Sequence, residues 1–234
     1  MSGSLRERIK RVQEIIALAC EKAQRDPREI TVVAVTKGVG VDSMREALEC
    51  GIRIFGENRL QEALSKIPLF GKEEAEWHFI GRVQGNKIKK IVENFQCVHS
   101  LDRVDHGREM EKRLKERGVA GYPVFVQVNL TGRETQGGVK EERLLDLVQE
   151  LGVMSSLRVT GLMTIAPLGG KEEEIRGVFR RLRELKERIN AENIPGVCIT
   201  ELSMGMSDDY PLAILEGATM VRLGRAIFGE GRKK

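Results

Sequence analysis

Lys37 is the residue whose position in this sequence most clearly suggests chemistry. It follows TVVAV (31–35), an apolar run rich in β-branched residues that is typical of a strand buried on both faces. We expect its stem to lie inside the mouth of the fold, where burial disfavours an ammonium and lowers the pKa of a lysine. A neutral amine can form a Schiff base with an aldehyde or ketone. A lysine at a strand end also commonly reaches solvent or pairs with a carboxylate, so position alone leaves both interpretations open.

Two glycine-containing segments near the end of the sequence could hold a phosphate. The first is SMGMSDD (203–209), in which Gly205 lets the backbone approach a ligand closely and Ser207 can cap the helix expected to follow. The second contains Gly224 and Arg225, after the last expected strand. The two aspartates after Ser207 are unfavourable next to a phosphate unless they point away. Phosphate binding and ordinary helix capping are both compatible with this pattern.

Arg222 and Asn58 are polar residues at strand ends, each with two possible roles. Arg222 lies within VRL near the end of the last expected strand, and a charge inside a fold must be paired or serve a ligand. Its alternative role is a structural ion pair, for example with Glu57. Asn58 could offer its amide to a ligand oxygen or cap the helix that follows it.

The histidines and cysteines do not predict a metal site. His78 lies between Trp77 and Phe79 and is expected to be a hydrogen-bonded core histidine. His99 and His106 have no metal-ligand spacing with it. The four cysteines are far apart and form no CxxC pair, so we expect free thiols in a reducing cytosol (Cys20, Cys50, Cys97, Cys198).

The elements that must position these residues alternate along the whole chain. Strands followed by helices predict a parallel sheet, and eight such units predict closure into a (β/α)8 barrel of the TIM type, with an open doubly wound sheet as the alternative. An amphipathic helix at 4–24 precedes the first strand, and we expect it to cover the bottom of the barrel. The expected strands are 31–35, 52–55, 77–80, 97–99, 122–129, 157–163, 197–202 and 219–223. The expected helices after them are 42–50, 58–66, 84–94, 103–117, 141–151, 172–193 and 208–217, with a short turn after the last strand.

Composition indicates a single globular domain over residues 1–234. The chain is 32% charged and 41% hydrophobic, and its net charge of +4 is too mild and dispersed to predict nucleic-acid binding. The polar N-terminus has no signal-peptide pattern, and no stretch is long and apolar enough to span a membrane. We therefore expect a cytoplasmic protein and a monomer.

Several segments, in order from end to end, resemble the pyridoxal phosphate homeostasis protein family, called YggS in bacteria and proline synthase co-transcribed homolog in animals. They are AVTKGV (34–39), FGENRLQE (55–62), WHFIGRVQGNK (77–87), VHSLDR (98–103), VFVQVN (124–129), GLMTIAP (161–167) and LSMGMSDDYPLAILEGATMVRLGRAIFG (202–229). The resemblance implies a barrel like the N-terminal domain of alanine racemase. It also implies a protein that binds pyridoxal 5′-phosphate and helps to keep it in balance, without established turnover, with apo-enzymes that use this cofactor as possible recipients.

The resemblance further implies a set of cofactor-binding residues. Lys37 carries the Schiff base, Arg222 faces the pyridine nitrogen, and Asn58 lies near the ring. The loops at Ser203–Gly205 and Gly224–Arg225 hold the phosphate. Two positions depart from the family pattern: Gln136 stands where we expect a lysine, and Arg225 where many members have a small hydroxyl residue.

Two enzymatic alternatives remain open at this point. An arginine at the ring nitrogen favours its unprotonated form and weakens the cofactor as an electron sink. A racemase also needs a second base, and among the two tyrosines Tyr122 should lie at the far end of its strand, leaving Tyr210. The alternatives are a racemase-like enzyme that uses Lys37 and Tyr210, and a Schiff-base aldolase that uses Lys37 on a ketone.

Overall fold

Eight parallel strands close into a barrel in the computed structural model, which describes residues 3–71, 73–133 and 135–229. Neighbouring strands follow the order β4-β3-β2-β1-β9-β8-β7-β5, and pairing of β4 with β5, as between Val98 and Val124, closes the ring. The predicted barrel is therefore confirmed, and the open doubly wound sheet is excluded. The barrel strands are β1 (Thr31–Val35), β2 (Ile54–Glu57), β3 (Glu76–Phe79), β4 (Cys97–Leu101), β5 (Tyr122–Asn129), β7 (Leu157–Met163), β8 (Val197–Ser203) and β9 (Met220–Leu223).

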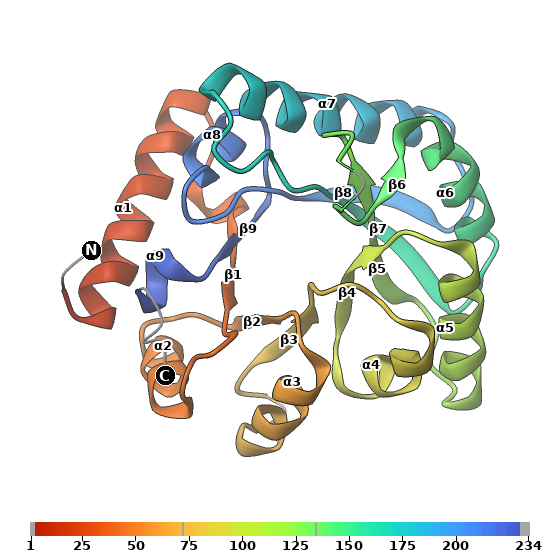
Figure 1. The fold of residues 1–234 in the computed structure, drawn as a ribbon, viewed down its shortest axis with the longest axis horizontal. Coiled ribbons are helices and arrows are strands. Elements are labelled where there is room, and N and C mark those ends of the chain that lie inside the picture. Colours follow the sequence, from red (N-terminus) through yellow and green to blue (C-terminus); the bar gives the residue numbers. More distant parts are fainter. Residues whose placement is uncertain (1–2, 72, 134, 230–234) are drawn as a thin grey trace.

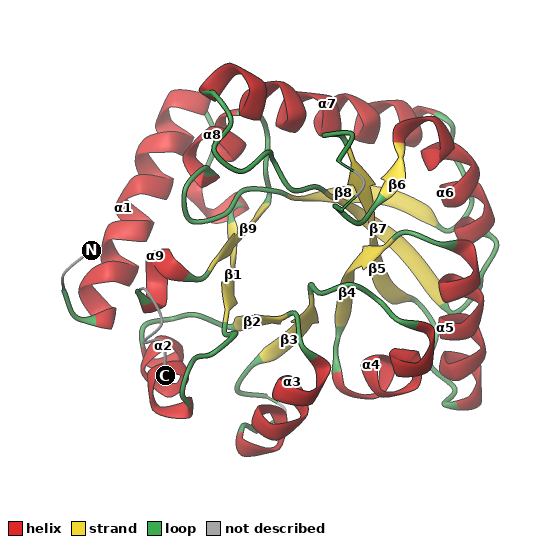
Figure 2. Ribbon diagram, viewed as in Figure 1, coloured by secondary structure: helices red, strands yellow, loops and turns green. Residues whose placement is uncertain are grey.

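Helices surround this ring, and Figure 2 shows them outside the strands. Their apolar faces pack with the strands into one large core. A smaller, separate apolar cluster contains Cys97, Phe125 and Met163. The α-helices are α1 (Leu5–Ala23), α2 (Val41–Glu49), α3 (Leu60–Lys66), α4 (Ile88–Asn94), α5 (Val104–Glu116), α6 (Leu144–Gly152), α7 (Glu172–Ala191), α8 (Tyr210–Leu215) and α9 (Arg225–Phe228). Short 3₁₀ helices lie at Pro27–Glu29, Ile67–Leu69, Gly85–Lys87 and Glu141–Arg143.

Helix α1 packs on the side of the barrel, so the expectation that it covers the bottom was wrong. It contacts α2, α8 and α9 (Figure 1). Arg8 Nε donates to the carbonyl of Ile227 at 2.7 Å, and Arg25 Nη1 donates to the carbonyl of Ala218 at 2.8 Å. Helix α9 is four residues long and too short to cover β9 and β1, so α1 takes the place of a full final helix in the outer ring.

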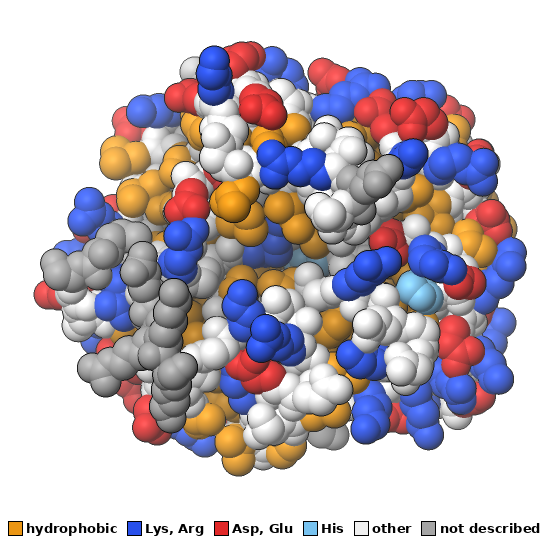
Figure 3. Space-filling view, in the orientation of Figure 1, with side chains coloured by type: hydrophobic (Ala, Val, Ile, Leu, Met, Phe, Trp, Pro, Cys, Tyr) orange, Lys and Arg blue, Asp and Glu red, His pale blue; other side chains and the backbone are white. Residues whose placement is uncertain are grey.

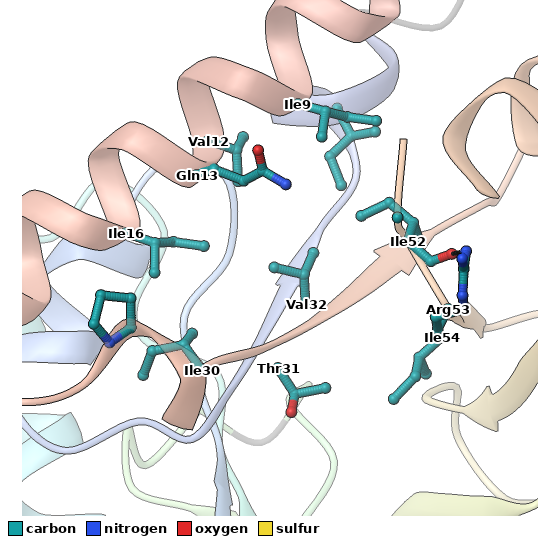
Figure 4. A pocket seen from close by; sticks show the side chains of 13 residues that line it. Ile9, Val12, Gln13, Ile16, Ile30, Thr31, Val32, Ile52, Arg53 and Ile54 are labelled. Carbon is teal, nitrogen blue, oxygen red and sulfur yellow. Dashed lines mark hydrogen bonds between the residues drawn. The ribbon is translucent and has the colours of Figure 1, made fainter. Parts of the chain in front are cut away.

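The seam between α1 and the barrel wall is incompletely filled. A cavity of about 310 Å³ lies between α1, β1 and β2, with the apolar side chains of Ile9, Val12 and Ile16 on one side and Val32 and Ile54 on the other (Figure 4). It contains none of the residues predicted to bind the cofactor. We therefore treat it as a packing feature of the added helix.

Two further differences from the prediction concern β6 and α8. Strand β6 (Val139–Lys140) was missed, because two residues are too short for a periodic pattern; it pairs with the end of β5 outside the ring. Helix α8 begins at Tyr210, two residues later than expected, so Ser207 is not its N-cap. No helix in the described ranges combines the length and apolarity needed to cross a bilayer.

Candidate functional site at the barrel mouth

The rim at the carboxyl ends of the strands brings together residues that are far apart in sequence. Strand β1 lies between β2 and β9, with Val35 paired to Gly56 and Ala34 paired to Leu223. The segments that follow these strands, which contain Lys37, Asn58 and Gly224, therefore leave the barrel side by side. Figure 3 shows a hollow over the ring of strands, with lysine or arginine side chains inside it and along its edge.

Lys37 is exposed, so the expectation that its stem is buried was wrong. The strand ends at Val35, and Thr36, rather than Lys37, fills the last buried position. Lys37 then begins a turn whose next residue, Gly38, has a left-handed φ of 71°. The amine is thus presented on the rim, where it is accessible to a ligand.

A buried polar cluster holds the turn that carries Lys37. Lys66 Nζ donates to the Thr36 carbonyl at 2.6 Å, to Glu57 Oε1 at 2.7 Å and to Glu62 Oε1 at 2.6 Å, which uses all three of its protons. Thr36 Oγ1 donates to Glu57 Oε1, and Gly38 N donates to Glu62 Oε1. We call Thr36, Glu57, Glu62 and Lys66 the turn-holding cluster. Sequence reasoning missed it, although the acidic residues of FGENRLQE were a signal.

Arg222 does not pair with Glu57, so that suggested alternative is wrong. Its Nη1 donates to the Ser203 carbonyl at 2.6 Å and to Ser203 Oγ at 2.7 Å, and its Nη2 donates to the Thr164 carbonyl at 2.8 Å. Burial lowers the pKa of Arg222 to about 10, while the charge of Asp209 opposes this shift. The guanidinium therefore stays charged at neutral pH inside the barrel mouth.

The remaining predicted residues lie on the same rim. Asn58 is exposed and does not cap α3, whose N-cap position is Arg59. Arg225 is half exposed and pairs with Asp208. Asp209, the second aspartate that would be unfavourable next to a phosphate, accepts a hydrogen bond from Met206 N at 2.5 Å. Both aspartates of the loop after β8 are thus engaged by the protein itself.

The loops after β8 and β9 are joined at this rim. Ser207 Oγ accepts a hydrogen bond from Ala226 N at 3.1 Å, which links the two segments. Gly205 has a left-handed φ of 92°, and its carbonyl accepts from Arg222 N. A Cβ at Gly205 would lie 2.6 Å from the Cβ of Ala213, so this position requires glycine both for its conformation and for space.

Gln136 joins the loop after β5 to the loop after β7. Its Oε1 accepts from Thr131 Oγ1 at 2.5 Å, and its Nε2 donates to the carbonyl of Ile165 at 2.7 Å. A lysine could not accept the first of these bonds. Gln136 thus forms a fixed link across the rim.

Ser203 faces inward and is fully buried, and its hydroxyl contacts His99 as well as Arg222. His78 lies in the same row of side chains, so its prediction as a hydrogen-bonded core histidine is confirmed. Burial, with smaller contributions from His78 and Arg222, holds the pKa of His99 well below its usual range. His99 is therefore neutral. The sequence did not predict that His99 lies inside the barrel next to Ser203.

The depressed pKa of His99 predicts how stability depends on pH. An unfolded chain takes up a proton on this histidine below about pH 6.5, whereas the folded protein does not, so this group's contribution to stability is lost as the pH falls. We expect His99→Gln to reduce the slope of the unfolding free energy between pH 6.5 and 5 by up to about 1.4 kcal/mol per pH unit. Urea titrations measure this slope. His106→Gln, which retains His99, is the control, and identical slopes in His99→Gln and wild type would contradict the assignment.

Both tyrosines are buried. Tyr122 lies at the start of β5, at the opposite end of the barrel as predicted, and donates to the carbonyl of Phe95 at 2.8 Å. Tyr210 is buried on α8, with Arg11 of α1 as its neighbouring charge, and burial raises its pKa to about 12. Tyr210 is thus a poor candidate for a base at neutral pH.

Comparison with known proteins gives the family. The model of the alanine racemase N-terminal domain matches residues 8–231. The pyridoxal phosphate homeostasis protein of Aquifex aeolicus is 41% identical, with 96% of this chain and 97% of that protein covered, and the one of Escherichia coli K12 is 36% identical, with 93% of each covered.

Solved structures agree with this assignment. PipY of Synechococcus elongatus PCC7942 with pyridoxal phosphate bound is 34% identical, with a TM-score of 0.83 over 97% of this chain and all of that one. Alanine racemase of Clostridium difficile 630, at 13% identity and a TM-score of 0.69 over 92% of this chain and 55% of that one, shares the fold. The chain therefore belongs to the pyridoxal phosphate homeostasis protein family.

Proposed function

We propose that this protein holds pyridoxal 5′-phosphate at the barrel mouth as a carrier or buffer of the cofactor, without catalytic turnover of its own. The observation that carries the proposal is the buried guanidinium of Arg222, whose hydrogen bonds within the described residues go to neutral oxygens. A buried cation of this kind favours a ligand that brings negative charge or a lone pair. The relative PipY, solved with this cofactor bound, supports the proposal.

The residues of the rim fit such a ligand. When bound, pyridoxal phosphate supplies an aldehyde that reacts with amines and a ring that withdraws electrons. We propose that Lys37 provides the amine for covalent attachment, that Arg222 donates to the ring nitrogen and that Asn58 lies beside the ring. Backbone N–H groups around Gly205 and Gly224, together with the Arg225 side chain, would hold the phosphate. Ser203 would act through Arg222, because its hydroxyl is already bonded there.

The same residues argue for holding the cofactor over transforming an amino acid. Arg222 is a donor that stays protonated at neutral pH, so it favours an unprotonated ring nitrogen and a weaker electron sink. The racemase alternative also requires a second base, and Tyr210 is buried with a raised pKa. Incubation with single L-amino acids should yield no D-enantiomer. Turnover that is lost in Tyr210→Phe would contradict the carrier proposal.

A transfer experiment tests the carrier function directly. The loaded protein is mixed with an apo-enzyme that requires pyridoxal phosphate, and the return of enzymatic activity is timed. In parallel, release of the cofactor into a carbonyl-reactive trap gives the rate of free dissociation. We expect activity to return faster than free release allows. Equal rates would contradict direct transfer to a recipient enzyme. Light scattering would check the proposed monomer.

Gly205→Val should weaken both the fold and the phosphate contact. The new side chain is strained at a φ of 92° and collides with Ala213, which predicts a loss of about 2–6 kcal/mol of unfolding free energy. We also expect weaker cofactor binding in spectroscopic titrations of the folded fraction. Gly177→Ala on α7 is the control, because this glycine lies away from the rim and a Cβ there would meet nothing within 4 Å. Equal stability and affinity in both variants would place the phosphate elsewhere.

A further inference from the structure

A row of hydrogen bonds crosses the barrel interior from Arg222 to the opposite end. Arg222 Nη1 lies 2.7 Å from Ser203 Oγ, and Ser203 Oγ lies 2.9 Å from His99 Nδ1. His99 Nε2 lies 2.8 Å from His78 Nδ1, and His78 Nε2 lies 3.0 Å from Glu76 Oε1. Glu76 begins β3 and is half exposed, whereas the other four side chains are buried. We call these five residues the barrel relay.

The two ends of the barrel relay determine the direction of every bond in it. Arg222 can only donate, so Ser203 Oγ accepts from it and directs its own proton to His99 Nδ1. At the other end, the hydrogen bond from His78 holds the pKa of Glu76 below its usual range, so its carboxylate can only accept. Each imidazole then accepts on Nδ1 and donates from Nε2.

The reverse direction leaves a buried group unsatisfied. If His99 carried its proton on Nδ1, Ser203 Oγ would receive two donors, Arg222 Nη1 and His99 Nδ1. Its own proton would then have no acceptor, because Ser203 Oγ has no third hydrogen-bond partner among the described residues. An unmade bond of a buried hydroxyl costs about 1–3 kcal/mol. The ring of Phe125 also helps to fix the orientation of the His99 imidazole, because the centroids of the two rings are 4.3 Å apart.

We propose that Glu76, His78 and His99 are positioning residues that act on the cofactor site through Ser203 and Arg222. Their directed bonds leave Ser203 Oγ free to accept from Arg222, and this bond aims the guanidinium at the mouth. The carboxylate that sets the direction lies at the end of the barrel opposite the ligand. The effect on the cofactor rests on the proposed function of Arg222, whereas the direction of the bonds does not.

The same region contains a possible metal-binding trio, which the barrel relay argues against. His78, Cys97 and His99 are buried and place one potential ligand atom each within 4.8 Å of the others. In the barrel relay, however, each imidazole nitrogen already donates or accepts a hydrogen bond, so no lone pair is left for a cation. Burial also raises the pKa of the Cys97 thiol well above its usual value, which disfavours the thiolate that a metal would need.

Nitrogen NMR of the histidine side chains tests the direction of the bonds in the protein without added ligand. We expect His78 and His99 to carry a proton on Nε2 and none on Nδ1, and His106→Gln identifies the signals of the third histidine. In Glu76→Leu the terminal acceptor is removed, and we expect the Nε2 proton pattern of the pair to change; Glu76→Gln, which keeps an acceptor oxygen, restores it. A proton on Nδ1 of either histidine in the wild type would overturn the proposal, as would Zn²⁺ binding that removes these proton signals.

Cofactor titration of the same variants tests the effect at the mouth. We expect Glu76→Leu to lower the affinity for pyridoxal phosphate about three- to tenfold and to shift the absorption of the bound cofactor, with recovery in Glu76→Gln. Glu93→Gln on α4 is a control with an unrelated exposed carboxylate. If the wild type shows the predicted tautomers but Glu76→Leu binds the cofactor as tightly as the wild type, the positioning role is refuted. If the wild type does not bind pyridoxal phosphate, the proposed function is refuted. The histidine tautomers would still show the direction of the hydrogen bonds in the barrel relay.

Discussion

Replacing Lys37 by alanine should give a folded protein that no longer retains pyridoxal 5′-phosphate through gel filtration. The side chain is exposed, and the turn is held by the turn-holding cluster and by the backbone of Gly38, so its truncation should change the unfolding free energy by only about 0.5 kcal/mol. The amine, by contrast, is the proposed covalent attachment point. Its loss leaves only the non-covalent contacts of the ring and the phosphate.

The absorption of the bound cofactor after gel filtration is the measurement. Lys37→Arg separates charge from nucleophilicity, because it keeps the cation but has no primary amine, and we expect it to fail as Lys37→Ala does. Lys89→Ala, an exposed lysine on α4, should bind like the wild type. Retention of the long-wavelength absorption band in Lys37→Ala would show that another amine, or no amine, holds the cofactor.

Lys66→Met should strongly lower the stability of the protein. Lys66 is the partner of the fully buried carboxylate of Glu57, and its own side chain is only 9% exposed. Removing one member of a buried ion pair costs about 3–5 kcal/mol, because the other member remains desolvated and unpaired. Burial already raises the pKa of Glu57, and Glu57 Oε2 has no hydrogen-bond partner among the described residues, so the carboxylate depends strongly on Lys66.

Chemical denaturation of a double-mutant cycle measures this dependence. Glu57→Leu combined with Lys66→Met should recover part of the loss, because an apolar pair leaves no buried charge. Lys10→Met removes an exposed pair with Glu14 and should cost at most about 1 kcal/mol. A cost below about 1 kcal/mol for Lys66→Met would show that water reaches Glu57 and that the turn-holding cluster contributes little. Because this cluster holds the Lys37 turn, we also expect weaker cofactor binding in Lys66→Met.

The sequence predicted which residues reach the rim better than it predicted their contacts. Alternating strands and helices were sufficient to place Lys37, Asn58 and Gly224 after neighbouring strands, because the carboxyl ends of parallel strands share one edge. The exposure of Lys37 was mispredicted, because it depends on whether Thr36 or Lys37 takes the last inward position. The strand pattern does not determine this detail.

The hydrogen-bond partners of side chains inside the barrel could not be predicted from the sequence pattern, for a different reason. Arg222 contacts Ser203 and Thr164, not Glu57, because the stagger between strands decides which inward side chains lie at the same height. His99 and Ser203 are 104 residues apart, and neither belongs to a local motif that would link them. The sequence pattern places Lys66 in a helix but gives no sign that it is buried and paired with Glu57.

The position of α1 has a consequence for the order in which the protein can fold during synthesis. Its Arg8 and Arg25 bond to the carbonyls of Ile227 and Ala218, so these contacts of α1 can form only after β9 and α9 have been made, whereas its contacts with α2 can form earlier. Until then the part of its apolar surface that packs on α8 and α9 stays exposed to solvent, and exposed apolar surface makes nascent chains prone to aggregate or to bind chaperones. The hydrogen bonds of Arg8 and Arg25 join residues that are 219 and 193 positions apart. Contacts between such distant segments form slowly, so we expect the docking of α1 to be a late step of folding.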